Sequence, residues 1–261
     1  MQNGIGVAGC GRMGKPMLEN LQKAGFRARG YDPRPDAGVG TNIETFCDGL
    51  QTLITVVRDA IETEALLFAD QSVVTRATAL RTIIISSTLS PHYVKSLRAR
   101  IPATVTLVDA PMSGAQVRAN AGTLTFMVGG DAAPVMPLLH AMGRDIHHMG
   151  AFGAGMTAKV LNNLLAASHT AMTRLVLDWG DAQGVDEEKL LSLIGTASGQ
   201  NWLASGFDEI EFARDGFTDD NSIGILAKDV GAALDIAPDS NTALPEAVRT
   251  AIQNLKPRPK R

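Results

Sequence analysis

One glycine-rich segment constrains the fold of this chain more than any other feature: Gly9-Cys10-Gly11-Arg12-Met13-Gly14. The apolar run at residues 4–9 predicts a short buried strand before it, and residues 12–25 follow with a helical pattern that ends at a glycine. Glycines at this spacing allow a tight turn, a close approach of a ligand to the backbone, and close packing of the helix on the strand. We therefore expect a strand–turn–helix unit that holds a phosphate group at the N-terminus of its helix.

A second predicted strand, residues 27–31, ends at Asp32, which lies about 20 residues beyond the glycine segment. In a dinucleotide-binding unit, an acidic residue at this place accepts hydrogen bonds from the adenosine ribose hydroxyls and repels a 2′-phosphate. The sequence thus favours NAD over NADP, although Arg34 carries the opposite charge two residues later. FAD uses the same fingerprint, and glycines that only turn the chain have the same pattern, so other segments must decide the chemistry.

Apolar, β-branched runs alternate with helix-permissive stretches through the rest of the first half. The predicted strands are residues 51–57, 82–87, 104–108, 124–128 and 145–149, and the predicted helices between them are residues 62–80 and 91–100. Strands that alternate with helices form a mainly parallel sheet covered on both faces. The expected fold class is α/β, with an N-terminal Rossmann-type, doubly wound sheet.

After residue 150 the strand pattern ends and helical patterns take over. Residues 155–183 carry apolar side chains that share one helical face, which predicts one long helix. Further apolar side chains on this helix lie outside that face and favour burial from a second side, within the chain or by a partner subunit. Residues 186–255 predict shorter helices, with breaks near residues 195–200, 215–221 and 238–241.

These patterns predict two domains. The first is a dinucleotide-binding Rossmann domain at residues 1–150, and the second is an all-α domain at residues 151–261 that binds substrate and dimerises. The extra apolar faces of the long helix lead us to expect a homodimer or a homotetramer.

Composition excludes several classes of protein. The formal net charge of −3 provides no broad positive field for nucleic acid, and we expect the basic residues at 256–261 to form a solvated terminus. No apolar run approaches the roughly 20 residues that span a bilayer. Cys10 and Cys47 lack the spacing of a metal site or a disulfide framework. We expect a cytoplasmic protein with no metal and no nucleic-acid or membrane partner.

Several segments resemble, in order, the signature blocks of the β-hydroxyacid dehydrogenases, the family that includes 3-hydroxyisobutyrate dehydrogenase and tartronate semialdehyde reductase. The glycine segment with Met17 resembles the first block. Ser87-Thr88-Leu89-Ser90-Pro91 resembles the family's cofactor loop. Asp109-Ala110-Pro111-Met112-Ser113-Gly114-Ala115, with Gly122 and Gly129-Gly130 downstream, resembles the substrate-binding block. Residues 153–163 resemble the catalytic block, and Lys228-Asp229 resembles the C-terminal Lys-Asp pair. Together they cover nearly the whole chain. The resemblance implies hydride exchange between a nicotinamide cofactor and a small β-hydroxy acid.

Lys159 and Asn163 stand four residues apart near the start of the predicted long helix, so both project from one face. A solvated face or a structurally satisfied lysine would also give this pattern. In hydride chemistry, a lysine can take the hydroxyl proton as the substrate is oxidised and return it in the reverse direction. To act as a base near neutral pH, a lysine pKa of about 10.4 must fall to about 7 to 8. Asn163 would orient the substrate oxygen, which is the role that the family resemblance implies for it.

The remaining site residues are expected to bind substrate or cofactor. Ser113, Gly114 and Ala115 follow a strand and offer a hydroxyl and amides to a substrate carboxylate, and Gly122 leaves room for a close approach, although a plain turn would look the same. By the resemblance, Lys228 contacts the cofactor or the substrate carboxylate. The cofactor-binding residues expected are Gly9, Gly11, Arg12, Met13, Gly14, Asp32, Val57, Thr88 and Lys228.

The sequence therefore predicts an NAD-dependent dehydrogenase of a small, carboxylate-bearing hydroxy acid, with Lys159 as general acid and base and Asn163 beside it. An imine or other carbonyl reductase on the same scaffold and a catalytically silent NAD-binding sensor are the alternatives. Arg58 departs from the family pattern and is expected to place a positive charge near the cofactor phosphate or the substrate.

Overall fold

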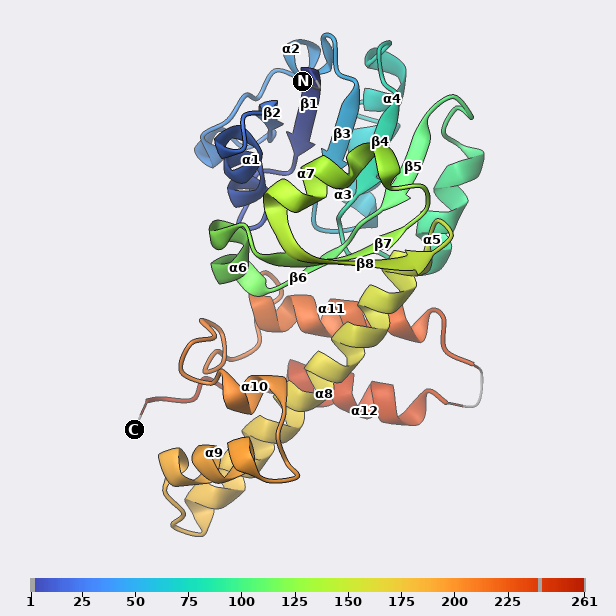
Figure 1. Ribbon diagram of the computed structural model, residues 1–261. Coiled ribbons are helices and arrows are strands. Elements are labelled where there is room, and N and C mark those ends of the chain that lie inside the picture. The colour runs from blue at the N-terminus through green and yellow to red at the C-terminus, as the bar shows by residue number, and fades with distance from the viewer. Residues whose placement is uncertain (1–2, 239–240, 261) are drawn as a thin grey trace. The chain divides into compact units, whose positions relative to one another are not determined.

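The computed structural model describes residues 3–238 and 241–260, and Figure 1 shows the arrangement of its helices and strands. Contacts between residues divide the chain into two compact units, Met1–Lys159 and Val160–Arg261. The strands are β1 (Asn3–Ala8), β2 (Arg27–Tyr31), β3 (Thr52–Thr55), β4 (Thr82–Ile85), β5 (Thr106–Asp109), β6 (Met112–Ser113), β7 (Leu124–Gly129) and β8 (Gly143–Gly150).

Seven α-helices begin and end among the described residues of the first unit. They are α1 (Gly14–Lys23), α2 (Ile43–Cys47), α3 (Ala60–Leu67), α4 (Val73–Arg76), α5 (Pro91–Ser96), α6 (Ala115–Ala121) and α7 (Met136–Met142). Short 3-10 helices lie at Pro35–Ala37, Leu97–Ala99 and Ala133–Val135.

One eight-stranded sheet forms the frame of the first unit. Its strand order is β2-β1-β3-β4-β5-β7-β6, and β8 pairs with β7. The first five strands in this order are parallel, whereas β7 runs antiparallel to β5 and β6. The strand order reverses direction at β1, as in doubly wound sheets. The predicted α/β class with a Rossmann-type sheet is confirmed.

Each face of the sheet carries its own hydrophobic core. Successive strand residues point to opposite faces, so Ile54 and Ile84 join side chains of α1, α6 and α7, while Leu53 and Ile83 join side chains of α2 to α5. Strands buried on both faces consist of nearly continuous apolar residues, which is the pattern that identified them in the sequence.

Asp109, at the carboxyl end of β5, links the sheet to the helix that follows it. Its fully buried carboxylate accepts hydrogen bonds from the backbone N–H groups of Gly153 and Met156, both at 2.6 Å. Burial raises the pKa of this carboxyl, and the backbone N–H groups act in the opposite direction. The carboxylate thus pairs the otherwise unsatisfied donors at the start of the long helix α8 (Ala154–Ala182).

Two glycines make this junction possible. A side chain on Gly129, which opposes Asp109 in the sheet, would collide with the Asp109 carboxylate and with the carbonyl of Ala151. A side chain on Gly155 would collide with the carbonyl of Met127. The backbone of α8 therefore approaches the sheet more closely than any side chain would permit.

In the second unit, all the regular elements that the structure describes are helices. Beyond α8 they are α9 (Glu187–Thr196), α10 (Trp202–Ser205), α11 (Ser222–Leu234) and α12 (Ala243–Gln253). Leu177 of α8 packs in a small core with Leu203, Phe207 and Ala213. The predicted long helix and all-α second part are confirmed. No helix among residues 3–238 and 241–260 is long and apolar enough to cross a membrane.

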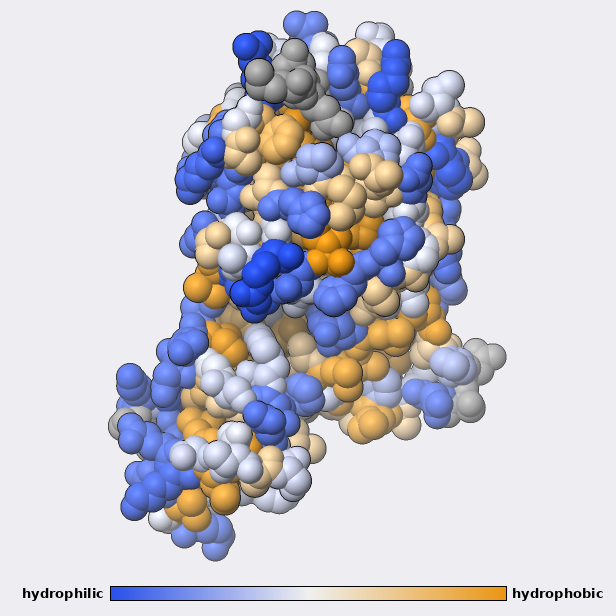
Figure 2. Space-filling model, viewed as in Figure 1, coloured by the Kyte–Doolittle hydropathy of each residue, from blue (hydrophilic) through white to orange (hydrophobic). Residues whose placement is uncertain are grey.

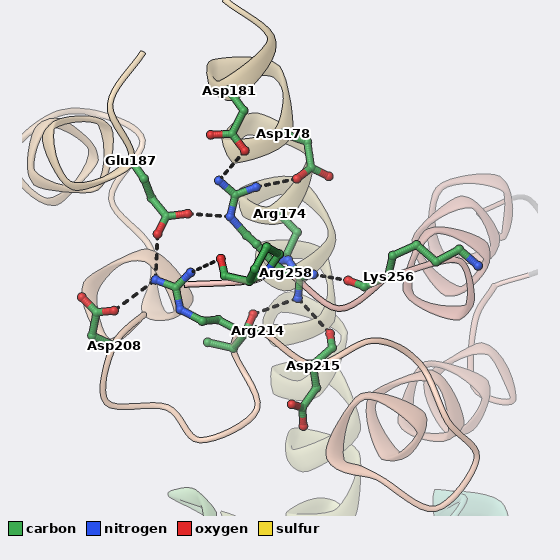
Figure 3. Close-up of polar contacts among 11 residues, drawn as sticks. Arg174, Asp178, Asp181, Glu187, Asp208, Arg214, Asp215, Lys256 and Arg258 are labelled. Carbon is green, nitrogen blue, oxygen red and sulfur yellow. Dashed lines mark hydrogen bonds and ion pairs between the residues drawn. The ribbon is translucent and has the colours of Figure 1, made fainter. Parts of the chain in front are cut away.

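The basic C-terminal segment is only partly the solvated terminus that the sequence predicted, because Lys256 and Lys260 are exposed but Arg258 is buried. Arg258 is only 7% exposed, and its guanidinium pairs with Asp178, Asp181 and Glu187 (Figure 3). Buried Arg174 of α8 donates hydrogen bonds to the carbonyl groups of Ala213, Asp215 and Lys256. A buried guanidinium must be paired, so this network fixes the segment against α8 and the start of α9.

Some elements of the first unit differ from the sequence expectation. The helix predicted over residues 62–80 is interrupted between α3 and α4, where Ser72 has a left-handed backbone conformation with φ 45°. Helices α2, α6 and α7 were not predicted. Ala115, expected in the substrate-binding segment, begins α6 with φ 53°, a strained value for a residue that has a side chain.

We predict that Asp109→Asn lowers the free energy of unfolding by about 3 kcal/mol, because the amide has one acceptor oxygen and points its own N–H groups at buried donors of α8. Urea unfolding followed by circular dichroism measures the change. The control is Asp70→Asn at an exposed position, which should change stability by less than about 0.5 kcal/mol. An equally small change in Asp109→Asn would contradict the role of this carboxylate.

We also predict that Arg258→Met destabilises the protein by about 3 kcal/mol, because it leaves Asp181 and Glu187, both largely buried, with fewer counter-charges. Lys260→Met removes an exposed charge two residues later and serves as the control. Thermal unfolding at equal protein concentration distinguishes the two variants. Equal unfolding temperatures would show that the network does not stabilise the native state.

Candidate active site

The residues expected to bind a dinucleotide follow the carboxyl ends of the parallel strands. Strands β1 to β5 all end at one edge of the sheet, and β1 lies between β2 and β3, where the strand order reverses. In open α/β sheets, ligands bind outside the carboxyl ends of the strands at this point. The glycine segment leaves β1 there, and Asp32, Val57 and Thr88 follow β2, β3 and β4.

The three glycines of the segment have different surroundings. Gly9 has φ 91°, and a Cβ atom on it would lie 2.6 Å from the carbonyl oxygen of Val56. A side chain on Gly14 would collide with the carbonyl of Gly9. Gly11 has only the Arg34 side chain nearby, 3.4 Å from the Cβ position. Packing therefore requires Gly9 and Gly14, whereas the backbone at Gly11 stays open to an approaching group.

The N-terminus of α1 is suited to a phosphate group. Its N-cap residue, Met13, provides no capping hydrogen bond from its side chain, and the first turn contains no acidic residue. An uncapped helix N-terminus presents backbone N–H groups and a partial positive charge. Together with the open backbone at Gly11, this arrangement fits the pyrophosphate of a dinucleotide.

Asp32 is held rigidly at the end of β2. Its side chain is 2% exposed, and its carboxylate accepts hydrogen bonds from the backbone N–H groups of Cys10 and Arg34, both at 3.0 Å. The guanidinium of Arg34 donates two more, each of 2.9 Å, from Nε to Oδ1 and from Nη2 to Oδ2. Burial alone would raise the pKa of Asp32, but these donors outweigh it and lower the pKa below its ordinary value. The carboxylate therefore stays ionised.

The thiol of Cys10 points away from this loop into the core. It is 2% exposed and contacts the carbonyl of Val7 at 3.5 Å. Burial raises the pKa of Cys10 to about 11. The residue thus contributes its backbone N–H, and not its thiol, to the loop.

Three buried hydroxyl groups at the carboxyl ends of β3 and β4 have no hydrogen-bond partner among the residues that the structure describes: Thr55, Ser86 and Ser87. Buried polar groups without partners are uncommon and are concentrated at functional sites. The loop after β4 is also tied to α8, because the backbone N–H of Leu89 contacts the sulfur of Met156 at 3.4 Å. This loop contains Thr88, which is half-buried.

The expected substrate-binding segment lies where β6 ends and α6 begins. Ser113 closes β6, Gly114 is the N-cap residue of α6 with φ 133°, and Ala115 is the first residue of that helix. Gly122 ends α6 with φ 66°, and a Cβ atom there would contact the amide of Asn20. The segment is thus a strand-to-helix connection, which excludes the alternative of a plain turn.

Lys159 and Asn163 lie one turn apart on α8. Both are buried, with 7% and 8% of their surfaces exposed. Lys159 is the last residue of the first unit, and Asn163 belongs to the second. Polar side chains are rarely buried to this degree without a partner or a function.

Asn163 is fixed by a residue from a distant part of the second unit. Its Nδ2 donates a 2.5 Å hydrogen bond to Asp229 Oδ2, and Asp229 is 1% exposed. The neighbouring Lys228 places Nζ 3.2 Å from the other oxygen of Asp229. Asp229 of the Lys-Asp pair therefore orients Asn163. The sequence prediction assigned a role only to Lys228.

Arg58 pairs with an acidic residue of the helix that follows it. Its Nε donates a 2.6 Å hydrogen bond to Glu62, and its backbone N–H donates to the same carboxylate. This exposed pair lies at the start of α3. The guanidinium is thus paired with an acid four residues away.

Two protein-family models match the chain. The first, the NAD binding domain of 6-phosphogluconate dehydrogenase, matches residues 4–150, and the second, described as NAD-binding of NADP-dependent 3-hydroxyisobutyrate dehydrogenase, matches residues 153–256. A 3-hydroxyisobutyrate dehydrogenase of Pseudomonas aeruginosa is 33% identical over 249 residues, which cover 88% of this chain and 84% of the relative. The chain belongs to the β-hydroxyacid dehydrogenase family.

Two further similar proteins bear on the type of reaction that the family member catalyses. An NAD-dependent L-serine dehydrogenase of Pseudomonas aeruginosa is 31% identical over 92% of this chain and 87% of its own length. The solved structure of Mycobacterium tuberculosis 3-hydroxyisobutyrate dehydrogenase with L-serine is 27% identical, covers 98% of this chain and 97% of its own, and has a TM-score of 0.78. The chain is therefore a nicotinamide-dependent oxidoreductase that acts on a CH–OH group. Its matches include both NAD- and NADP-dependent proteins.

Two residues of this dehydrogenase escaped the sequence prediction. Asp109 was noted only as part of a motif, and its bonds to the start of α8 span 44 and 47 residues. Asp229 was noted only beside Lys228, and its bond to Asn163 spans 66 residues. Local patterns cannot reveal such pairs. The available signal was a single acidic residue placed inside an otherwise apolar segment.

Proposed function

We propose that this protein transfers a hydride between NAD and a small β-hydroxy acid that carries a carboxylate, with Lys159 as general acid and base. The observation that carries the proposal is the burial of Lys159 and Asn163 one turn apart on α8, at the positions that match the family's catalytic block. The named relatives act on 3-hydroxyisobutyrate and L-serine, which are small acids with a hydroxyl group, and this supports the substrate class.

A bound nicotinamide would accept the hydride when the substrate is oxidised and would donate it in the reverse direction. As the substrate carbon is oxidised, Lys159 takes the proton of the hydroxyl group at its Nζ atom, and in the reverse direction it returns that proton to the carbonyl oxygen. Asn163 donates its second amide N–H to the same substrate oxygen. Asp229 holds that amide in one orientation, so Asn163 positions the oxygen without competing for the proton.

The substrate carboxylate is bound by the hydroxyl of Ser113 and the backbone of Gly114 and Ala115, with Gly122 leaving space and Lys228 supplying a positive charge. The strained backbone at Ala115 supports this assignment, because strain of this kind is concentrated at binding sites. The pyrophosphate is bound by the segment from Gly9 to Gly14, including the backbone of Arg12 and Met13. The adenosine ribose is bound at Asp32, and the nicotinamide half beside Val57, Thr88 and Lys228.

We further propose that two copies of the chain associate through α8. The helix carries large apolar side chains that are half or more exposed and spaced along one face: Leu161, Leu165, Met172 and Trp179. Figure 2 shows hydrophobic residues on the surface of the helical unit. Apolar stripes of this extent are typical of subunit interfaces. Both cysteines are free and buried, which is compatible with the reducing cytoplasm, where we place the protein.

Lys159→Ala is expected to lower turnover by at least about a hundredfold and to leave dinucleotide binding unchanged. Turnover is measured as NADH absorbance with a panel of small hydroxy acids, and binding as NADH fluorescence. Lys189→Ala, at an exposed position of α9, should behave as the wild type. Near-normal turnover in Lys159→Ala would overturn the assignment. A wild type that binds NADH and oxidises none of the acids would favour the silent sensor.

The double variant Leu165→Glu/Met172→Glu should convert a dimer or tetramer into a smaller species, because like charges would face each other across the interface. Light scattering coupled to size exclusion gives the molar mass. Ile61→Glu replaces a more exposed apolar residue on α3 and should leave the mass unchanged. A monomeric wild type at micromolar concentration would refute association through α8.

A further inference from the structure

Three half-buried polar side chains gather where β6 pairs with β7: Ser113, Arg118 and Thr125. Ser113 and Thr125 lie directly opposite each other in this antiparallel pair, so their side chains share one face and their Cβ atoms are about 5 Å apart. The preceding pair, Met112 and Phe126, points to the other face, into the core that also contains side chains of α1, α6 and α7. Ser113 and Thr125 therefore point away from that core.

Arg118, which belongs to α6, reaches this pair of hydroxyl groups. Its Nη1 donates a 3.3 Å hydrogen bond to Thr125 Oγ1. Its Cδ and Cβ atoms lie 2.6 Å and 2.7 Å from the place that a Cβ atom on Gly114 would occupy, so the aliphatic part of the side chain lies against this glycine. Arg118 therefore brings a positive charge to the cross-strand neighbour of Ser113, beside the segment proposed to bind the substrate carboxylate.

The guanidinium of Arg118 has no carboxylate partner within residues 3–238 and 241–260, where its hydrogen bond goes to the neutral hydroxyl of Thr125. Other half-buried arginines are better paired: Arg214 binds the carboxylate of Glu187, and Arg98 donates to three backbone carbonyl groups. A guanidinium carries five N–H donors, and a cation that is largely withdrawn from water normally has a counter-charge. Most donors of Arg118 thus remain available to an anion.

We propose that Arg118 binds the substrate carboxylate and thereby makes the protein select anionic hydroxy acids over neutral alcohols of the same shape. The inference rests on the proposed function and deepens it, because it adds a specificity-determining residue to the carboxylate site assigned to Ser113. The planar fork of a guanidinium matches the two oxygens of a carboxylate. Thr125 orients this fork by accepting a hydrogen bond from Nη1, and its own O–H can donate to the same carboxylate.

The test compares the hydroxy acid that the wild type oxidises fastest with the methyl ester of that acid, which carries no negative charge. We expect Arg118→Gln to raise the KM of the acid at least about tenfold, because charge-assisted hydrogen bonds to the carboxylate are lost. The kcat should change less than about threefold, because the lost contact is made equally in the ground state and the transition state. The KM of the ester, or its inhibition constant if it is not oxidised, should stay unchanged.

Two further variants separate recognition of the carboxylate from a structural role. Arg118→Lys keeps the charge without the planar fork and should recover part of the lost affinity for the acid. Arg27→Gln removes an exposed arginine at the start of β2 and should change neither the acid nor the ester constant. A residue that acted only on stability would affect the acid and the ester alike.

Thr125→Val keeps the test decisive if Arg118→Gln fails to fold, as its unfolding temperature will show. The substitution preserves the shape of the side chain and removes the hydroxyl that orients the guanidinium. It should raise the KM of the acid about threefold and leave the ester unaffected.

The outcomes that overturn the inference differ from those that overturn the proposed function. If the KM of the acid is unchanged in Arg118→Gln, or if the acid and the ester are weakened equally, Arg118 does not bind the carboxylate and the dehydrogenase proposal stands. If the folded wild type oxidises none of the small hydroxy acids, the proposed function itself fails, and the inference fails with it.

Discussion

The buried carboxylate of Asp109 connects the sheet of the first unit to the start of the long helix α8. It ends a central strand, and it accepts hydrogen bonds from the backbone N–H groups at the start of α8, so the sheet that carries the glycine segment also fixes the helix that carries Lys159. Gly129 and Gly155 leave room for this close approach, because a side chain at either position would collide with the sheet or the carboxylate. Without the carboxylate, buried donors of α8 would lack partners, and the first turns of the helix would lose their register on the sheet.

The strands and the long helix were predictable because each is defined by a local pattern. Strands buried on both faces need uninterrupted apolar residues, and a helix of eight turns repeats its pattern often enough to be unambiguous. The short helices α2, α6 and α7 contain at most two turns, so their patterns carry little information. The break between α3 and α4 depends on the backbone conformation of Ser72, which no periodicity indicates.

The residues of the candidate site also fall into two groups, those that a local pattern predicts and those that it does not. The roles of Gly9 and Gly14 follow from spacing, because tight packing at a strand–helix turn has a fixed sequence signature. The contact of Asn163 with Asp229 and the burial of Arg258 depend on residues far apart in the chain, and only the folded structure reveals them. Asp32 and Arg34 are near neighbours in sequence, yet the sequence does not indicate that the guanidinium binds the carboxylate through two hydrogen bonds.

The position of Cys10 has a consequence for the redox behaviour of the protein. Helix N-termini lower the pKa of nearby thiols and make them more reactive. Here the side chain turns into the core, and burial raises its pKa to about 11, so the nucleophilic form is nearly absent at neutral pH. The segment between β1 and α1 therefore presents no reactive thiol to solvent.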